Sequence, residues 1–233
     1  MTSSHVTVKR GEVEPGESWY AAAVRKCGDA NAKPWAVDLS GDTLVFGQGQ
    51  GPGDVASVEI RPLVREDFPG IVAWQSMPHV KRWWNDEART VRDIEKHYGG
   101  ALDGTDPTRL WVVAVNGRPC GFLQDYLIGD HPEYALLTAR PEAVGFDYLI
   151  GDPNQVGKGV GTRIVWEFLR DLVWPHYADV KELFAAPDHR NIGSLRMLAK
   201  LGFVQGLWFD EPQPGGRVDT VVACTLDVPL VLG

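Results

Sequence analysis

The sequence predicts an α+β fold with a central mixed β-sheet flanked by helices, preceded by a small N-terminal extension. Two apolar strands meet at Asn116-Gly117, a dipeptide that supplies the positive φ angles of a tight hairpin turn and so indicates antiparallel pairing. After residue 143, strands alternate with helices, so the pairing within the sheet is mixed. The 233 residues, 44% of them hydrophobic, are enough to bury a sizeable core.

Residues 1–54 are expected to form the extension and a linker, and residues 55–233 the main domain. Within the extension, residues 17–28 read as a short helix ended by a glycine, and residues 43–47 as a strand. The run GQGQGPGD at 47–54 cannot hold a helix or a central strand, which favours a linker. A phosphate-binding loop is the alternative, but a proline interrupts the run and no strand and helix flank it.

The main domain shows regular hydrophobic periodicity along most of its length. Its first half predicts a strand at 57–64, a helix at 66–77, an irregular aromatic segment at 78–87, a helix framed by Thr90 and Gly99, and hairpin strands within 109–128. Its second half predicts strands at 143–152, 181–187 and 217–228, and helices at 159–177 and 191–202.

Composition restricts the classes of partner. The formal charge is −8 and the pI about 5.2, so the chain has no electrostatic reason to bind nucleic acid or an anionic membrane. Cys27, Cys120 and Cys224 lie far apart, which fits reduced thiols in core positions and excludes a thiolate metal site. The N-terminal residues lack the apolar run of a leader, and we expect a cytoplasmic protein without a metal.

The turn at residues 157–162, Gly-Lys-Gly-Val-Gly-Thr, is the most informative segment. A strand runs into it and an amphipathic helix follows directly, so its backbone N–H groups converge at a helix N-terminus, where anions bind. Glycine allows a phosphate to approach the backbone closely. A glycine-rich turn without a ligand is the alternative. Neither the Walker motif nor the dinucleotide fingerprint is present.

This turn resembles the acetyl-CoA pyrophosphate loop of the GNAT N-acyltransferases. A second GNAT signature is matched by Asn191, Ser194, Lys200, Gly202 and Phe203. The resemblance covers roughly residues 57–227 and implies a GNAT fold with acetyl-CoA as cosubstrate. The residues it assigns to acetyl-CoA are Leu149, Ile150, Gln155, Val156, Gly157, Lys158, Gly159, Val160, Gly161, Thr162, Asn191 and Ser194.

Within GNAT, the segments at 80–90, 121–126 and 145–150 resemble aminoglycoside 6'-N-acetyltransferases. This likeness implies transfer to a primary amine of a small polar cation, with no nucleic acid or membrane partner. The implied substrate wall consists of Trp83, Trp84, Gln124, Asp125, Tyr126 and Asp147. Siderophore-type lysine N-acyltransferases, which act on a hydroxylysine-like amine, are the first alternative; they usually carry histidine at the position of Asp147. A non-catalytic module that binds acyl-CoA is the second.

Asp147 is the candidate catalytic residue. It interrupts an apolar strand, where a carboxylate is costly without a purpose, and a carboxylate beside the amine would help to deprotonate it. A structural aspartate satisfied by backbone donors is the alternative.

The sequence departs from the family at two positions. Leu198 replaces the tyrosine that many GNAT enzymes use to protonate the leaving thiolate, and Ala186 replaces an aspartate. Protonation of the thiolate must then come from water, from another side chain, or from no group of the enzyme. Tyr126 is the first side chain to try.

Overall fold

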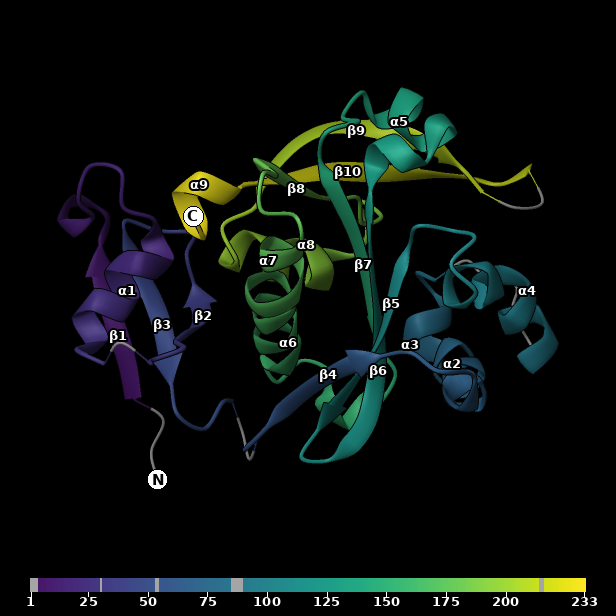
Figure 1. Cartoon of the computed structure of the whole chain (residues 1–233), viewed down its shortest axis with the longest axis horizontal. Coiled ribbons are helices and arrows are strands. Elements are labelled where there is room, and N and C mark those ends of the chain that lie inside the picture. Colours follow the sequence, from purple (N-terminus) through teal and green to yellow (C-terminus); the bar gives the residue numbers. More distant parts are fainter. Residues whose placement is uncertain (1–3, 30, 53–54, 85–89, 214–215) are drawn as a thin grey trace.

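The computed structural model describes residues 4–29, 31–52, 55–84, 90–213 and 216–233. Two sheets organise them (Figure 1). The smaller has the antiparallel order β1-β3-β2, from strands Ser4–Lys9, Trp35–Asp38 (β2) and Thr43–Gln48 (β3). The larger has the order β4-β5-β6-β7-β8-β10-β9.

The strands of the larger sheet pair antiparallel with one exception, β7 with β8, so the predicted mixed sheet is confirmed. These strands are β4 Val58–Pro62, β5 Arg109–Val115, β6 Arg118–Leu127, β7 Val144–Ile150, β8 Glu182–Ala185, β9 Val204–Pro212 and β10 Val218–Asp227. The hairpin turn between β5 and β6 is as predicted, because Asn116 and Gly117 have φ of 50° and 73°. Local sequence patterns did not predict β9 or the two strands that flank β3, β1 and β2.

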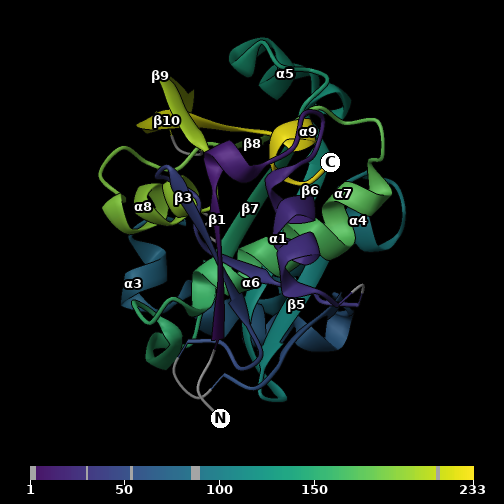
Figure 2. The ribbon, with the colours of Figure 1, turned by 90° about the vertical axis from the view of Figure 1, so that its left-hand side faces the viewer.

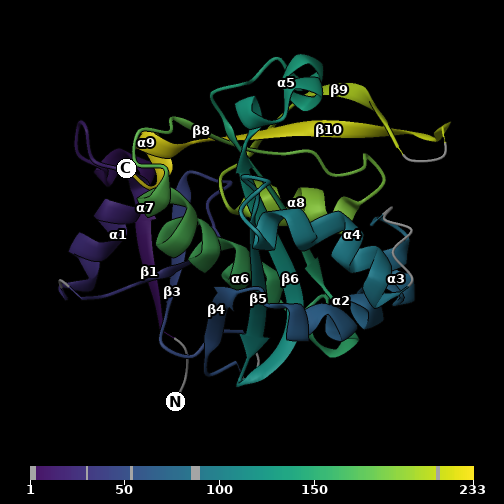
Figure 3. The same ribbon diagram turned by 45° about the vertical axis from the view of Figure 1, so that its right-hand side comes forward.

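Helices cover both faces of the larger sheet, and α1 packs on β1 of the smaller one. The helices of the described residues are α1 Trp19–Cys27, α2 Phe68–Gln75, α3 Pro78–Lys81, α4 Val91–Leu102, α5 Pro132–Thr138, α6 Val160–Phe168, α7 Trp174–His176, α8 Ile192–Lys200 and α9 Val228–Val231. A π-helical turn, Leu169–Val173, joins α6 to α7. Figure 3 shows α2, α3 and α4 together in front of one face of the sheet. Helices α6 and α8 lie on the other face, beside the smaller sheet (Figure 1).

The helix framed by Thr90 begins as predicted but ends later. Thr90 accepts a hydrogen bond from the N–H of Asp93, whose carboxylate accepts from the N–H of Thr90, a complete capping box. The predicted end at Gly99 is wrong: the helix continues to Leu102, and Gly99 is buried within it. A glycine lowers helix stability without forcing the helix to stop when tertiary packing supports it.

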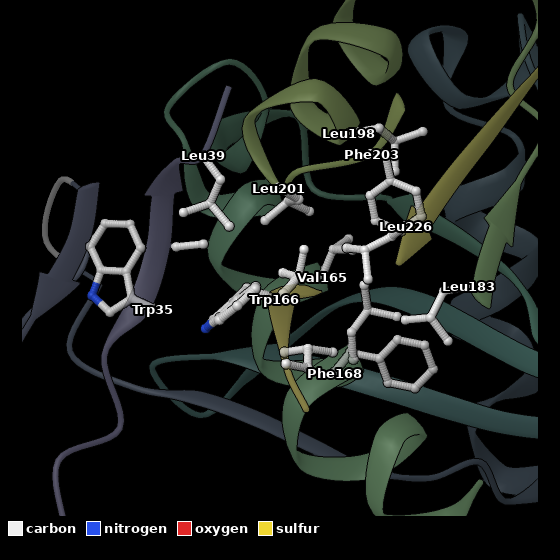
Figure 4. Close-up of a cluster of buried hydrophobic side chains, with 14 of the residues drawn as sticks. Trp35, Leu39, Val165, Trp166, Phe168, Leu183, Leu198, Leu201, Phe203 and Leu226 are labelled. Carbon is white, nitrogen blue, oxygen red and sulfur yellow. The ribbon is translucent and has the colours of Figure 1, made fainter. Parts of the chain in front are cut away.

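The N-terminal extension shares a hydrophobic core with the main domain. Figure 2 shows β1, β3 and α1 in front of α6. Trp35 and Leu39 belong to the same buried cluster as Trp166 of α6 and Leu201, which follows α8 (Figure 4). The indole N–H of Trp166 also donates to the carbonyl of Pro34 at 3.0 Å. The extension therefore packs against helices α6 and α8. The domain boundary between residues 54 and 55 stays a prediction.

The predicted linker is shorter than expected. Gly47 and Gln48 are the last residues of β3, and Gly51 is buried beside Arg163: a Cβ built at Gly51 would lie 2.4 Å from the guanidinium. The last two positions of the run, 53 and 54, lie outside the described residues.

Candidate active site

The strands β7 and β8 separate partway along their length. They pair only at Val144–Leu183 and Gly145–Phe184, while β7 continues to Ile150 in register with β6. Within the part of the chain that the structure describes, one edge of β7 therefore has no strand neighbour from residue 146 onward. Backbone groups at such an edge are available to an extended ligand.

A groove of about 580 Å³ runs from this edge to the glycine-rich turn. Its lining includes ten of the twelve residues assigned to the cosubstrate: Leu149, Ile150, Gln155, Val156, Gly157, Gly159, Gly161, Thr162, Asn191 and Ser194. The other two do not line it. Lys158 is exposed on the turn, and the side chain of Val160 is buried in the core.

The turn has the geometry of an anion site. Gly157 and Gly159 have φ of 74° and 80°, values that residues with a Cβ rarely adopt, and Gly159 is the N-cap of α6. The positive end of the helix dipole and the N–H groups of its first turn thus face the groove. These residues fit a pyrophosphate at the turn.

A second cavity, of about 280 Å³, adjoins the groove. Four carboxylates line it: Asp147, Asp188, Glu211 and Asp219. Among the described residues its lining contains no lysine or arginine. Two of the carboxylates have arginine partners, since Arg190 lies 2.6 Å from Asp188 and Arg217 lies 2.9 Å from Asp219. Because Asp147 and Glu211 add negative charge beside these two ion pairs, the cavity favours a cationic ligand.

Asp147 lies at the wall of this cavity, and its role beside the amine stays a prediction. The side-chain amide of Gln124, opposite it on β6, donates to its Oδ2 at 2.8 Å. Trp83 and Trp84 line both the cavity and the groove. The segment expected to form an aromatic wall continues into residues 85–89, which lie outside the described residues.

Asp125 and Tyr126 are not on the cavity wall. Asp125 is fully buried on the opposite face of β6, where it pairs with Arg109 at 2.7 Å and accepts from the indole N–H of Trp111 at 2.7 Å. Tyr126 shares a face with Gln124, but its ring fills the space beside Gly145 and contacts the ring of Tyr134. The prediction of both as substrate-wall residues is corrected, because strand alternation and ring packing direct them elsewhere.

Glu211 is, with Asp188 and Asp219, one of three cavity carboxylates that the sequence did not reveal. It comes from β9, a strand that carries little apolar periodicity, so no local pattern marked it. Burial, together with the negative charge of Asp147, raises the pKa of Glu211 to about 7, while a hydrogen bond from Gln213 opposes this shift. This group therefore changes charge near neutral pH.

Residues 64–210 match the acetyltransferase (GNAT) domain family. The chain belongs to the GNAT family. It is 27% identical over 150 residues to the aminoglycoside N(6')-acetyltransferases type 1 of Klebsiella pneumoniae and of Serratia marcescens, a match that covers 63% of this chain and 74% of each relative.

Solved GNAT structures are similar as well. A crystal structure of an aminoglycoside 6'-acetyltransferase with coenzyme A is 26% identical, with a TM-score of 0.59, and covers 73% of this chain and 95% of its own. A structure of such an enzyme with paromomycin and acetyl-CoA has a TM-score of 0.60 at 26% identity, and covers 73% of this chain and 93% of its own. The GNAT fold is thus confirmed, and the protein is an acetyl-CoA-dependent N-acetyltransferase.

Across the ranges that the structure describes, His, Cys, Asp and Glu side chains form no group of three that is able to hold a metal ion. In the same ranges no helix is both long enough and apolar enough to cross a membrane.

Replacing Leu198, which stands where many GNAT enzymes have tyrosine, is expected to lower stability without raising turnover. Leu198 is fully buried in the core and does not line the groove. We expect Leu198→Tyr to overpack the core and cost about 1–3 kcal/mol of unfolding free energy. Thermal denaturation and kcat measured together check this. A variant with unchanged Tm and faster turnover would show instead that position 198 reaches the leaving thiolate.

Proposed function

We propose that this enzyme acetylates the 6'-amine of an aminoglycoside or a similar aminated sugar. The observation that carries the proposal is the cavity with four carboxylates beside the acetyl-CoA groove. A substrate with several amines presents several positive charges, and a carboxylate-lined wall attracts them. The relatives named above, which are aminoglycoside acetyltransferases, support the same substrate class.

Each part of the cavity then has a role. Asp147 meets the reacting amine, favours its approach as a cation and accepts its proton, because attack on a thioester requires a neutral nitrogen. Gln124 orients the Asp147 carboxylate. Glu211, Asp188 and Asp219 hold the other amines, and Trp83 and Trp84 offer aromatic faces to the cation.

The same lining distinguishes this substrate from the alternative of a hydroxylysine-like amine. An amino-acid substrate carries a carboxylate of its own. The described lining offers it no lysine or arginine, and Asp147 and Glu211 add negative charge beside the two arginine-paired carboxylates. Ala186 stands where the related enzymes have an aspartate. Glu211 on β9 and Asp219 on β10 line the same cavity as Ala186, so their carboxylates take the place of that aspartate.

Glu211 is expected to make binding of the amine depend on pH. Because its pKa is about 7, the side chain gains its negative charge as the pH rises through neutrality. We expect the affinity for an aminoglycoside to rise between about pH 6 and 8 in the wild type, and this increase to be largely lost in Glu211→Gln. Calorimetric titration at several pH values measures it, with Glu133→Gln on the exposed surface of α5 as the matched control.

The same group affects folding in the opposite direction. A carboxyl whose pKa is raised by folding contributes stability at low pH and loses that contribution as the pH rises through the folded-state value. The free enzyme is therefore expected to lose stability between about pH 5 and 7, and Glu211→Gln to lose less. If Glu211→Gln, Glu133→Gln and the wild type all show the same pH dependence of affinity and the same pH dependence of Tm, Glu211 has no part in substrate binding.

A further inference from the structure

The two cavities meet at a small set of shared residues. The residues that line both are Trp83, Trp84, Tyr148, Asn191 and Ser194. If the larger groove holds acetyl-CoA and the smaller cavity the amine, as the proposed function requires, the carbonyl carbon and sulfur of the thioester lie at this junction. Tyr148 and Ser194 are the two hydroxyl-bearing residues there.

The hydroxyls of Tyr148 and Ser194 are hydrogen-bonded to each other. Tyr148 lies on β7, with its ring stacked on Phe146 on the face that packs against α8. Ser194 is in the first turn of α8, where its N–H donates to the side chain of Asn191 at 3.2 Å. The pair thus joins the unpaired edge of β7 to the positive end of a nine-residue helix, a position that favours negative charge.

Both hydroxyls keep their protons at working pH. Burial raises the pKa of Tyr148 well above its usual range, and the hydrogen bond to Ser194 offsets only part of this shift. A phenol that stays neutral is a hydrogen-bond donor, and such donors stabilise an anion that forms beside them in a partly buried site.

Four other positions are less suited to donate a hydrogen bond to the leaving sulfur. Leu198 is buried in the core, and Tyr126 is outside both cavities. His79 lines the groove, but its Nε2 is 2.8 Å from the carbonyl of Ile150, and His97 lines only the smaller cavity.

We propose that the hydroxyl pair of Tyr148 and Ser194 donates the hydrogen bond that stabilises the thiolate of coenzyme A as it leaves. The amine nitrogen bonds to the carbonyl carbon, the carbon–sulfur bond breaks, and the sulfur keeps the electron pair. Asp147 passes the proton of the ammonium to solvent before the attack and accepts the second nitrogen proton as the new bond forms. The thiolate takes a proton from solvent after the carbon–sulfur bond has broken, and Asp147 then gives up its proton, so each cycle releases one proton. The hydroxyl pair keeps both of its protons, and this chain replaces the missing tyrosine of α8 by a donor on β7.

The test titrates the thiol of bound coenzyme A and needs no amine substrate. Thiolate absorbance is recorded against pH as the difference between coenzyme A and desulfo-coenzyme A, so that the enzyme's own thiols cancel. We expect binding to the wild type to shift the thiol equilibrium roughly tenfold toward thiolate relative to free coenzyme A. Tyr148→Phe and Ser194→Ala are each expected to remove most of this shift and to lower kcat roughly tenfold, with coenzyme A affinity changed less than about threefold.

Tyr20→Phe is the matched control, because Tyr20 is half-buried in α1 against Trp166 and lies outside both cavities. It is expected to leave the shift and kcat unchanged. A shift that survives both Tyr148→Phe and Ser194→Ala, or a bound thiol that titrates like the free one in the wild type, overturns the inference. Failure of coenzyme A to bind the wild type would instead contradict the cosubstrate groove, so the two failures are distinguishable. If Tyr148→Phe unfolds, Ser194→Ala, which keeps the helix, decides alone.

Discussion

Replacing Asp147 by asparagine is expected to lower turnover by roughly 10²-fold or more, the scale on which loss of acid–base assistance is felt. Asparagine has the same size and still accepts a hydrogen bond from Gln124, but it cannot take a proton from the attacking amine. Steady-state thiol release with a saturating amine measures kcat. Because Asp147 lines the smaller cavity and not the groove, the affinity for coenzyme A should stay within about threefold of the wild-type value.

Asp188→Asn serves as the matched control. Asp188 lines the same cavity, but Arg190 holds its carboxylate and lowers its pKa, so it is not placed to accept the proton. We expect this variant to weaken substrate binding while its kcat changes far less than that of Asp147→Asn. A folded Asp147→Asn enzyme with wild-type turnover would show that Asp147 has only a structural role on β7.

Replacing Gly159 by valine is expected to weaken coenzyme A binding roughly 10²-fold. At φ of 80° a β-branched residue is strained, and a Cβ at this position would lie 3.3 Å from Pro52. The turn must then change shape, and its N–H groups no longer converge on the pyrophosphate. Isothermal calorimetry with coenzyme A measures the affinity.

Two control variants show whether the loss of affinity comes from the backbone of the turn, from the charge on the turn, or from backbone strain in general. Lys158→Ala removes an exposed ammonium and is expected to cost about 1 kcal/mol of binding or less. Gly104→Val introduces similar strain at φ of 74° in a residue outside both cavities, so it should lower Tm and leave affinity intact. Unchanged affinity in Gly159→Val would contradict the assignment of this turn to the cosubstrate.

Local signals in the sequence identified most of the frame that holds the site. The hairpin at Asn116-Gly117, the capping box at Thr90 and the turn before α6 each depend on interactions within a few residues, so short patterns reveal them. The face alternation of β7 was predictable too: Leu149 belongs to the cluster beneath α2 and α4, and Phe146 to the cluster beneath α8.

The remaining parts of the site depend on contacts between distant segments. Glu211 reaches the cavity only because β9 pairs with β10, and Tyr148 meets Ser194 across 46 positions of the chain. A contact between distant segments also explains why Asp125 does not line the cavity. Its partner Arg109 lies 16 positions away on β5, and this ion pair holds the Asp125 carboxylate on the other face of the sheet. Strand periodicity gives the face of a residue within its strand, but only tertiary packing decides which face meets the substrate.

Release of coenzyme A in the presence of acetyl-CoA and a matched pair of aminoglycosides tests the account most directly. One member of the pair carries an amine at the 6' position, and the other carries a hydroxyl there with the same remaining amines. The account predicts rapid thiol release with the first, a single acetyl group on its 6' nitrogen by mass spectrometry and NMR, and only background release with the second. Binding of both compounds without acetyl transfer to either, or equal turnover of the two, would contradict it.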